Sequence, residues 1–482
     1  RVAVVVTVSP QSRAALAAYF GLSPATCLAR LAGWFKWLGV RAVWDLGTAR
    51  DCVLLEEAAE FVERYRATQA GGAGSSGDAA GSAAGAAASG PLPVMASSCP
   101  GWVCYAEKTH GSRVLPHLSS TRSPQGAMGG LVKSLVANAW GVTPGSLYHV
   151  TVMPCYDKKL EASRDELTTT VTTVGAVGSS VGAATDDDSM VVDGGDGQQG
   201  AAKIPEVDCC LTTGEVLQLL QQRPPPCCDT QAATDTSSSN NSIIGASGSS
   251  SSSTNGTGAL LLAHPAAPAA APDPLLPGLG PDAQLYGLQY GSSSGGYADF
   301  VFRVAARELC GLEVPPGALP WRTLRNADFQ ELSLDLTTGA SSSSSLSSAA
   351  NSSTSGQATQ GSLRFARVYG FRNIQTLLRQ IKMGRCSYHY VEVMACPSGC
   401  LNGGGQVKPG PGVTPQQLIE QLEAVYAHSD VAARSPADNP AVVALYGNWL
   451  GGRPGSPAAR QLLHTTFRER EKTVTAATVA NW

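Results

Sequence analysis

The chain has 482 residues, of which 43% are hydrophobic and 15% are charged, and its formal net charge is −3. This charge disfavours a nucleic-acid or membrane-surface partner, because both attract strongly basic proteins. We find no uninterrupted apolar run of about 18 residues, so we expect no transmembrane helix. The 13 cysteines are an odd number in a long chain, which favours metal or redox chemistry in the cytoplasm over a secreted disulfide framework.

Strand and helix patterns alternate along the chain. Apolar, β-branched runs predict strands at Val2–Val8, Arg41–Asp45, Val94–Ser97, Tyr148–Met153, Phe365–Tyr369 and Tyr388–Met394. Helical spacing predicts helices at Ser12–Phe20, Pro24–Leu38, Cys52–Tyr65, Gly214–Gln222, Tyr297–Leu309 and Asn373–Met383. This alternation is typical of an α/β fold with largely parallel sheets, in which ligands bind beyond the carboxyl ends of strands.

Low-complexity sequence interrupts this pattern four times, at residues 71–90, 168–202, 230–296 and 337–361. These segments have too little apolar surface to offset the entropy of ordering, so we expect disordered surface insertions. The chain begins at Arg1 and enters a predicted strand at once. We therefore expect a fragment of a longer protein that lacks an N-terminal segment.

Three cysteine motifs each begin where a predicted strand ends. The first contains Cys99, the second Cys155, and the third Cys396 and Cys400. Four thiolates suit a four-iron cluster, and the glycines around them let backbone N–H groups approach its sulfurs. Zinc is the competing metal, although zinc ribbons usually carry paired Cys-x2-Cys knuckles. Buried structural thiols are the third interpretation of the same residues.

The three motifs resemble the three signatures of the iron-only hydrogenase family. They read Ser97-Ser98-Cys99-Pro100-Gly101-Trp102, Met153-Pro154-Cys155-Tyr156-Asp157-Lys158 and Ala395-Cys396-Pro397-Ser398-Gly399-Cys400. The resemblance implies two lobes of mainly parallel sheets flanked by helices, with a cluster between the lobes. It also implies a large-subunit-like core over residues 1–430 and a small-subunit-like helical segment over residues 431–482.

The resemblance also assigns roles to individual residues. The positions that match the family's ligands of a [4Fe-4S] cluster are Cys99, Cys155, Cys396 and Cys400. The positions that match the pocket of a second, two-iron subcluster in active hydrogenases are Gln125, Met153, Lys158 and Met394.

Ser98 departs from the hydrogenase pattern, in which a cysteine at this position relays protons. A hydroxyl has a far higher pKa than a thiol and is a poor proton carrier at neutral pH. The blocks Cys99–Lys108 and Ser294–Ala298 instead resemble the family's eukaryotic branch of cytosolic iron–sulfur assembly factors and nuclear prelamin A recognition factors. This branch implies a second four-iron cluster on the N-terminal segment that we expect to be missing.

The leading hypothesis is therefore a non-enzymatic, cytoplasmic assembly factor that passes four-iron clusters from a scaffold to a targeting complex and its apoproteins. The terminal Trp482 resembles the aromatic C-terminus by which such factors dock on the targeting complex. Two alternatives stay open. One is a [FeFe] hydrogenase-type oxidoreductase with an altered proton relay, and the other is a nuclear protein that binds a prelamin tail.

Overall fold

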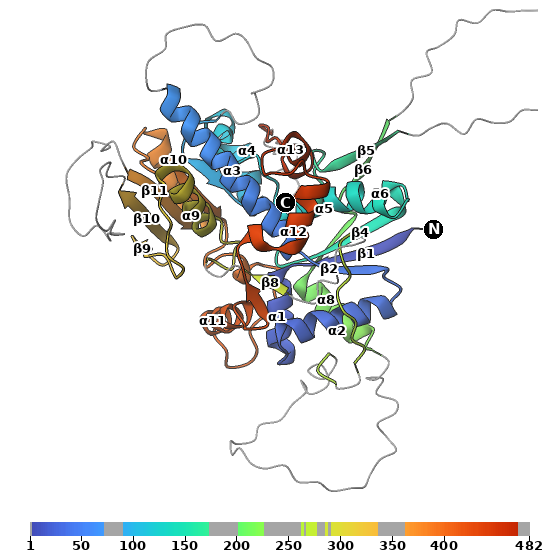
Figure 1. Ribbon diagram of the computed structural model, residues 1–482. Coiled ribbons are helices and arrows are strands. Elements are labelled where there is room, and N and C mark those ends of the chain that lie inside the picture. The colour runs from blue at the N-terminus through green and yellow to red at the C-terminus, as the bar shows by residue number, and fades with distance from the viewer. Residues whose placement is uncertain are drawn as a thin grey trace, which may run out of the picture.

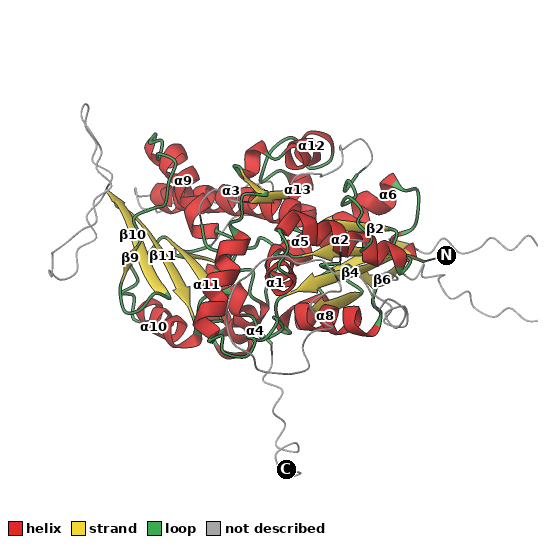
Figure 2. Ribbon diagram, turned by 90° about the horizontal axis from the view of Figure 1, so that it is seen from below, coloured by secondary structure: helices red, strands yellow, loops and turns green. Residues whose placement is uncertain are grey.

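Two β-sheets lie side by side in the protein, and helices cover both (Figure 1, Figure 2). The computed structural model describes residues 2–71, 90–172, 201–225, 262–264, 267–276, 285–287, 291–335 and 362–470. Helix α3 (Gly47–Gly71) begins just after a strand of the first sheet, and its Phe61 packs against Phe365 and Tyr390 of the second. The helix therefore joins the two lobes.

The first sheet is parallel throughout, with the strand order β2-β1-β4-β7. Its strands are β1 (Ala3–Val8), β2 (Ala42–Asp45), β4 (Leu147–Met153) and β7 (Cys209–Thr212), and helices α1 (Pro10–Phe20), α2 (Pro24–Trp37) and α8 (Thr213–Gln222) cover one face. Val6 and Val8 belong to the core under these helices, whereas Val5 belongs to the core that contains α3. Burial on both faces explains why β1 is a continuous apolar run.

The second sheet has the strand order β3-β12-β11-β10-β9. Its strands are β3 (Val94–Ala96), β12 (Tyr390–Met394), β11 (Ser362–Tyr369), β10 (Phe329–Asp335) and β9 (Arg322–Thr323). The first three are parallel, and the last two add antiparallel strands at the edge. Helices α4 (Pro100–Thr109) and α10 (Phe371–Lys382) pack on one face, and α3 and α9 (Tyr297–Cys310) pack on the other. The lobe is thus an α/β layer structure.

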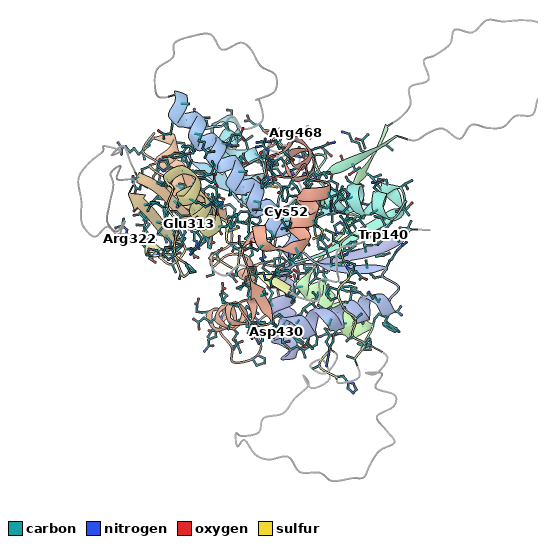
Figure 3. All side chains as sticks on the ribbon, in the orientation of Figure 1. Cys52, Trp140, Glu313, Arg322, Asp430 and Arg468 are labelled. Atoms are coloured by element: carbon teal, nitrogen blue, oxygen red, sulfur yellow. The ribbon has the colours of Figure 1, made fainter. Side chains whose placement is uncertain are left out.

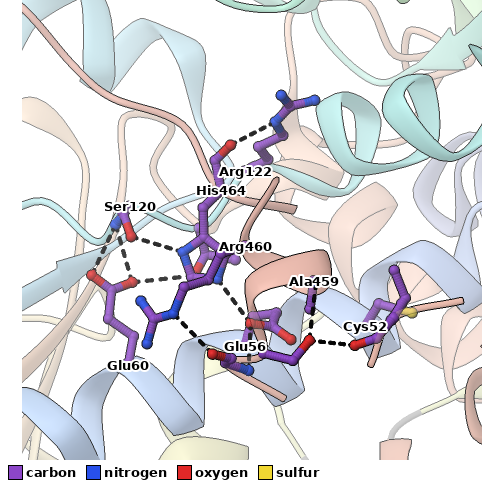
Figure 4. Close-up of polar contacts among 12 residues, drawn as sticks. Cys52, Glu56, Glu60, Ser120, Arg122, Ala459, Arg460 and His464 are labelled. Atoms are coloured by element: carbon purple, nitrogen blue, oxygen red, sulfur yellow. Dashed lines mark hydrogen bonds and ion pairs between the residues drawn. The ribbon is translucent and has the colours of Figure 1, made fainter. Parts of the chain in front are cut away.

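The C-terminal helices α12 (Pro440–Asn448) and α13 (Pro457–Leu463) are tied to α3 by a buried carboxylate (Figure 4). Glu56 is fully buried and accepts hydrogen bonds from the Tyr446 hydroxyl at 2.6 Å and the Gly455 N–H at 2.9 Å. His464 Nε2 lies 2.8 Å from the same carboxylate. Because an unpaired carboxylate in this position would be costly, the C-terminal region and α3 stabilise each other.

The sequence predictions of fold class and of the main strands are confirmed. Ser23 is the N-cap of α2, because its side chain accepts a hydrogen bond from the Thr26 N–H. Among the described residues, no single helix is long and apolar enough to cross a membrane, and α1 and α2 meet that test only as a pair bent by 97°. Both helices belong to the core of the first lobe.

Two of the segments predicted as disordered insertions contain residues that belong to the folded structure. Strands β5 (Thr168–Thr172) and β6 (Ala201–Pro205) pair antiparallel within and beside the segment predicted as disordered at 168–202. Within 230–296, Asp273 accepts hydrogen bonds from Val43 N and Lys36 Nζ, each at 2.9 Å, so this piece packs against the first lobe. The remaining parts of these insertions, the segments 72–89 and 336–361, and Trp482 lie outside the described residues.

Candidate metal centre

The carboxyl ends of the parallel strands in both sheets point toward one cavity between the lobes. Cys99 follows β3 and precedes α4, and Cys155 follows β4 and precedes α7 (Asp157–Ala162). Cys396 follows β12, and Cys400 begins a short 3-10 helix, η8 (Cys400–Asn402). All four cysteines line one cavity, which we call the four-cysteine cavity; its empty space, including the part open to solvent, is about 710 Å³. The predicted ligand set is therefore brought together in space from three separate loops.

Local hydrogen bonds fix the loop that carries Cys99. The Ser97 hydroxyl donates to the Val393 carbonyl of the neighbouring strand β12 and accepts from the Cys99 N–H at 3.0 Å. Pro100 occupies the first turn of α4, where its missing N–H costs nothing. The chain therefore turns sharply from strand to helix with Cys99 held at the turn.

The loop that carries Cys396 and Cys400 depends on close backbone approaches. A Cβ atom at Gly399 would lie 2.0 Å from Ser294 Oγ, and one at Gly403 would lie 2.3 Å from the Pro154 carbonyl oxygen. Only glycine leaves room at these two positions. Gly403 therefore lets this loop lie against the Cys155 loop, and Gly399 lets it lie against the loop of Ser294.

A buried carboxylate holds Cys400 indirectly. The Cys400 N–H donates to Ser294 Oγ at 2.9 Å. The loop of Ser294 is held by Glu392, which is fully buried and accepts from the Ser292 hydroxyl and the Ala298 N–H, each at 2.8 Å. The Tyr369 hydroxyl adds a third hydrogen bond to Glu392 at 2.7 Å. Sequence reasoning gave Glu392 no role, although the residue lies only four positions before Cys396.

Burial dominates the electrostatics of the thiols. Desolvation raises the pKa of Cys155 to about 12 and that of Cys396 to about 11, and it also raises the pKa of Cys99 and of Cys400. In the metal-free protein the thiols are therefore neutral at physiological pH. Because metals bind thiolates, occupation of the site must release protons.

Lys158 supplies a positive charge to the wall of the four-cysteine cavity. Burial favours the neutral amine, but the Glu161 carboxylate, 2.8 Å from Nζ, outweighs it and raises the pKa of Lys158. The Ser123 hydroxyl lies 2.9 Å from the same nitrogen. A permanent cation beside four thiolates offsets part of their charge.

The donor set fits a cluster better than a single ion. Within the ranges that the structure describes, His, Cys, Asp and Glu side chains form no group of three or more that is tight enough to hold one metal ion. The four thiols instead line the wall of one cavity. Soft thiolate ligands favour iron–sulfur clusters, zinc or Cu(I), and the spread of these thiols favours the first.

The other predicted pocket residues divide into two groups. Met153, Lys158 and Met394 line the four-cysteine cavity and are buried. Gln125 does not line it and instead lies behind the wall, where its amide donates to the Lys158 carbonyl at 3.0 Å and accepts from Thr151 Oγ1 at 2.9 Å. Gln125 thus stabilises the loop of Lys158 from behind the cavity wall.

Ser98 lies at the edge of the same cavity. It is 9% exposed, and its hydroxyl lies 3.5 Å from the Ser294 carbonyl oxygen and 3.8 Å from Met394 Sδ. The side chain that stands in place of the hydrogenase relay cysteine therefore faces the predicted pocket residues.

Sequence reasoning missed the contribution of α1 and α3 to the cavity wall. Gln11 lines the cavity and donates from Nε2 to the Ser293 carbonyl at 2.7 Å. Arg50 also lines it and pairs with Asp51 at 2.7 Å. Both residues follow strands of the first sheet, and that position at a carboxyl strand end was the signal that could have found them.

Two protein-family models together match almost the whole chain. The family model for the C-terminal domain of the iron-only hydrogenase large subunit matches residues 2–179 and 195–404. The model for the iron hydrogenase small subunit matches residues 416–470. Fold and site together define a protein of the hydrogenase type, and the chain belongs to the iron-only hydrogenase family.

Three similar curated proteins carry names other than hydrogenase. The chain is 38% identical to Protein NAR1 of Arabidopsis thaliana over 99% of this chain and 80% of that protein. It is 39% identical to cytosolic iron-sulfur assembly component 3 of Mus musculus, over 97% of this chain and 75% of that protein. It is 37% identical to the cytosolic Fe-S cluster assembly factor narfl of Danio rerio, over 99% of this chain and 89% of that protein.

Solved structures agree on the fold. A variant of the [FeFe]-hydrogenase HydA1 from Chlamydomonas reinhardtii superposes with a TM-score of 0.66 at 24% identity, covering 98% of this chain and 95% of that chain. A hydrogenase structure described as revealing stepwise H-cluster assembly gives a TM-score of 0.65, also at 24% identity. The match covers 97% of this chain and 95% of that chain. At this level of identity the likeness concerns the fold alone.

Proposed function

We propose that this protein is a cytosolic iron–sulfur cluster assembly factor that holds a four-iron cluster on Cys99, Cys155, Cys396 and Cys400 and passes such clusters to recipient apoproteins. The observation that carries the proposal is the convergence of these four thiols, from three loops, on one cavity. The names of the relatives, at 37–39% identity over nearly the whole chain, support the same role.

The chain's own residues define how the cluster would be held as cargo. The four thiols lose their protons and bind iron, and their raised pKa values make occupation favour higher pH. Lys158 offsets the negative charge of the thiolates. Ser294 and Ser97 orient the backbone of the Cys400 and Cys99 loops. Thiolate-bound clusters can also exchange electrons, with a potential set by such neighbours.

Ser98 supports a role without hydrogen turnover. A proton relay at neutral pH needs a group that gains and loses a proton readily, and a serine hydroxyl does not. The hydroxyl also lies within 3.8 Å of Met394 Sδ in a buried position, where a charged form would be costly. We infer that the chain is not an enzyme and that its partners belong to the iron–sulfur assembly machinery.

Anaerobic reconstitution of the protein tests this function. We expect about four irons in this chain, an electron paramagnetic resonance signal after reduction, and activation of an apoenzyme that requires a four-iron cluster. Infrared spectra of protein produced together with hydrogenase maturation factors should lack carbonyl and cyanide bands. Such bands, together with hydrogen evolution, would instead establish the hydrogenase alternative.

A further inference from the structure

A second cavity lies against the four-cysteine cavity and shares part of its wall. This side cavity, of about 420 Å³, is lined by Ser98, Cys99, Arg122, Arg164, Thr465 and Phe467, among others. Ser98, Cys99 and Pro100 line both cavities. Cys155, Cys396 and Cys400 line the first cavity and not the second. Cys99 is therefore the ligand of the proposed set that can be approached from the side cavity.

The C-terminal segment 465–470, which we call the strap, covers the side cavity. Its backbone is joined to the rest of the lobe where the Thr465 N–H donates to the Ser120 carbonyl at 2.7 Å. Phe467 packs against the core around α4, and the Arg164 guanidinium lies 5.7 Å from its ring. Thr465 and Phe467 point into the cavity, whereas Thr466 is exposed to solvent.

The charged end of the strap is held at the surface. Arg468, which is labelled in Figure 3, pairs with Asp165 at 3.1 Å and with Glu166 at 3.0 Å, yet it stays 60% exposed. Arg470 pairs with Glu166 at 2.9 Å. Arg470 also lies 3.5 Å from the fully buried carboxylate of Glu107, so this end of the strap is anchored to the lobe. The strap is thus a surface segment that forms one wall of the side cavity through Thr465 and Phe467.

The chemistry of the side cavity suits a small thiol. Val103, Leu167 and Phe467 give it an apolar surface. Arg122 and Arg164 add guanidinium groups, each paired with a buried carboxylate, Glu206 at 2.6 Å and Glu107 at 2.6 Å. The Glu161 carboxylate, paired with Lys158 at 2.8 Å, also lines the cavity, so the charges in its wall are paired and suit a neutral thiol.

We propose that the side cavity is an entry site for an incoming thiol, which replaces Cys99 as the cargo leaves the protein. This rests on the proposed function. The incoming thiol gives up its proton and forms a sulfur–iron bond. Cys99 gives up its own sulfur–iron bond and takes up that proton, so charge and atoms balance and no oxidant or reductant is needed. The thiol is either a cysteine of an acceptor protein or a low-mass thiol such as glutathione.

Cysteine labelling in the metal-free protein tests the access route without any cluster. The full chain is treated with N-ethylmaleimide, and the labelling rate of each ligand cysteine is followed by peptide mass spectrometry. Thr465→Phe, which fills the side cavity, should slow labelling of Cys99 several-fold and leave Cys155 and Cys396 unchanged. Phe467→Ala, which opens the cavity, should speed it. Thr466→Phe, on the exposed side of the strap, is the matched control and should behave as the wild type.

Unchanged Cys99 labelling in both Thr465→Phe and Phe467→Ala, with native circular dichroism spectra, would overturn the proposal. The two sources of thiol are then separated with cluster-loaded protein. Slower transfer to an apo-acceptor in Thr465→Phe assigns the cavity to acceptor cysteines, and slower bleaching by glutathione assigns it to small thiols. If Thr465→Phe slows neither transfer to the apo-acceptor nor bleaching by glutathione, the exchange step is overturned. Loaded protein that transfers nothing, even as wild type, contradicts the proposed function instead and leaves the labelling result standing.

Discussion

The backbone N–H of Cys400 donates a hydrogen bond to the Ser294 hydroxyl, 2.9 Å away, although the two residues are 106 positions apart in the chain. Ser294 belongs to the loop that leads into α9, and Glu392 fixes that loop from the middle of β12. The position of one proposed ligand cysteine is therefore set by a serine that no cysteine motif contains.

Ser294→Ala removes this hydrogen bond while leaving the ligand itself in place. We expect the loaded protein to lose its visible absorption to an iron chelator roughly two- to tenfold faster, since a net hydrogen bond is worth about 0.5–1.5 kcal/mol. Ser163→Ala, a change at an exposed serine after α7, is the control. An equal bleaching rate in the two variants would show that Ser294 does not hold the site.

Two adjacent glycines give a steric test of the third cysteine loop. A Cβ at Gly403 would lie 2.3 Å from the Pro154 carbonyl oxygen, whereas one at Gly404 would lie no closer than 3.8 Å to the Tyr156 ring. Gly403→Ala should therefore destabilise the fold by about 1–3 kcal/mol and lower the iron content after reconstitution. Gly404→Ala should match the wild type in both respects. Chemical denaturation and iron analysis measure the two effects, and the account fails if the two variants are alike.

Glu57 gives the stability of the protein a defined pH dependence. Burial, reinforced by the neighbouring Glu60 carboxylate, raises the pKa of Glu57 to about 8 from its ordinary value of 4.5. The folded protein therefore binds a proton that the unfolded chain releases, and the associated stability is present below about pH 4.5 and is lost as the pH rises through about 8.

Glu57→Gln removes this titration. The wild type should lose more unfolding free energy than Glu57→Gln between about pH 5 and pH 8, measured by chemical denaturation at each pH. Glu63→Gln, at a position on the same helix that is 47% exposed, should keep the wild-type slope. Parallel curves for Glu57→Gln and the wild type would contradict the assignment.

The sequence predicted what depends on local pattern and on motif. Strand runs such as Val2–Val8, the Ser23 cap of α2 and the cysteine loops after β3, β4 and β12 could all be predicted, because each is encoded by neighbouring residues. Glu392 could not be assigned to the site, because its role arises only when distant elements pack together. Arg50 was missed although its position after β2 was a usable signal. Residues 267–276 look like low-complexity sequence, yet Asp273 binds the edge strand β2.

The measurement that tests the central claim most directly is the iron content of a cysteine series after anaerobic reconstitution. Changing Cys99, Cys155, Cys396 or Cys400 to serine should abolish or strongly reduce bound iron and its visible absorption, because each removes one thiolate from the four-cysteine cavity. Cys104→Ser is the matched control, since Cys104 lies one helical turn beyond Cys99 and does not line that cavity. Full iron and unchanged absorption in Cys400→Ser would contradict the ligand assignment.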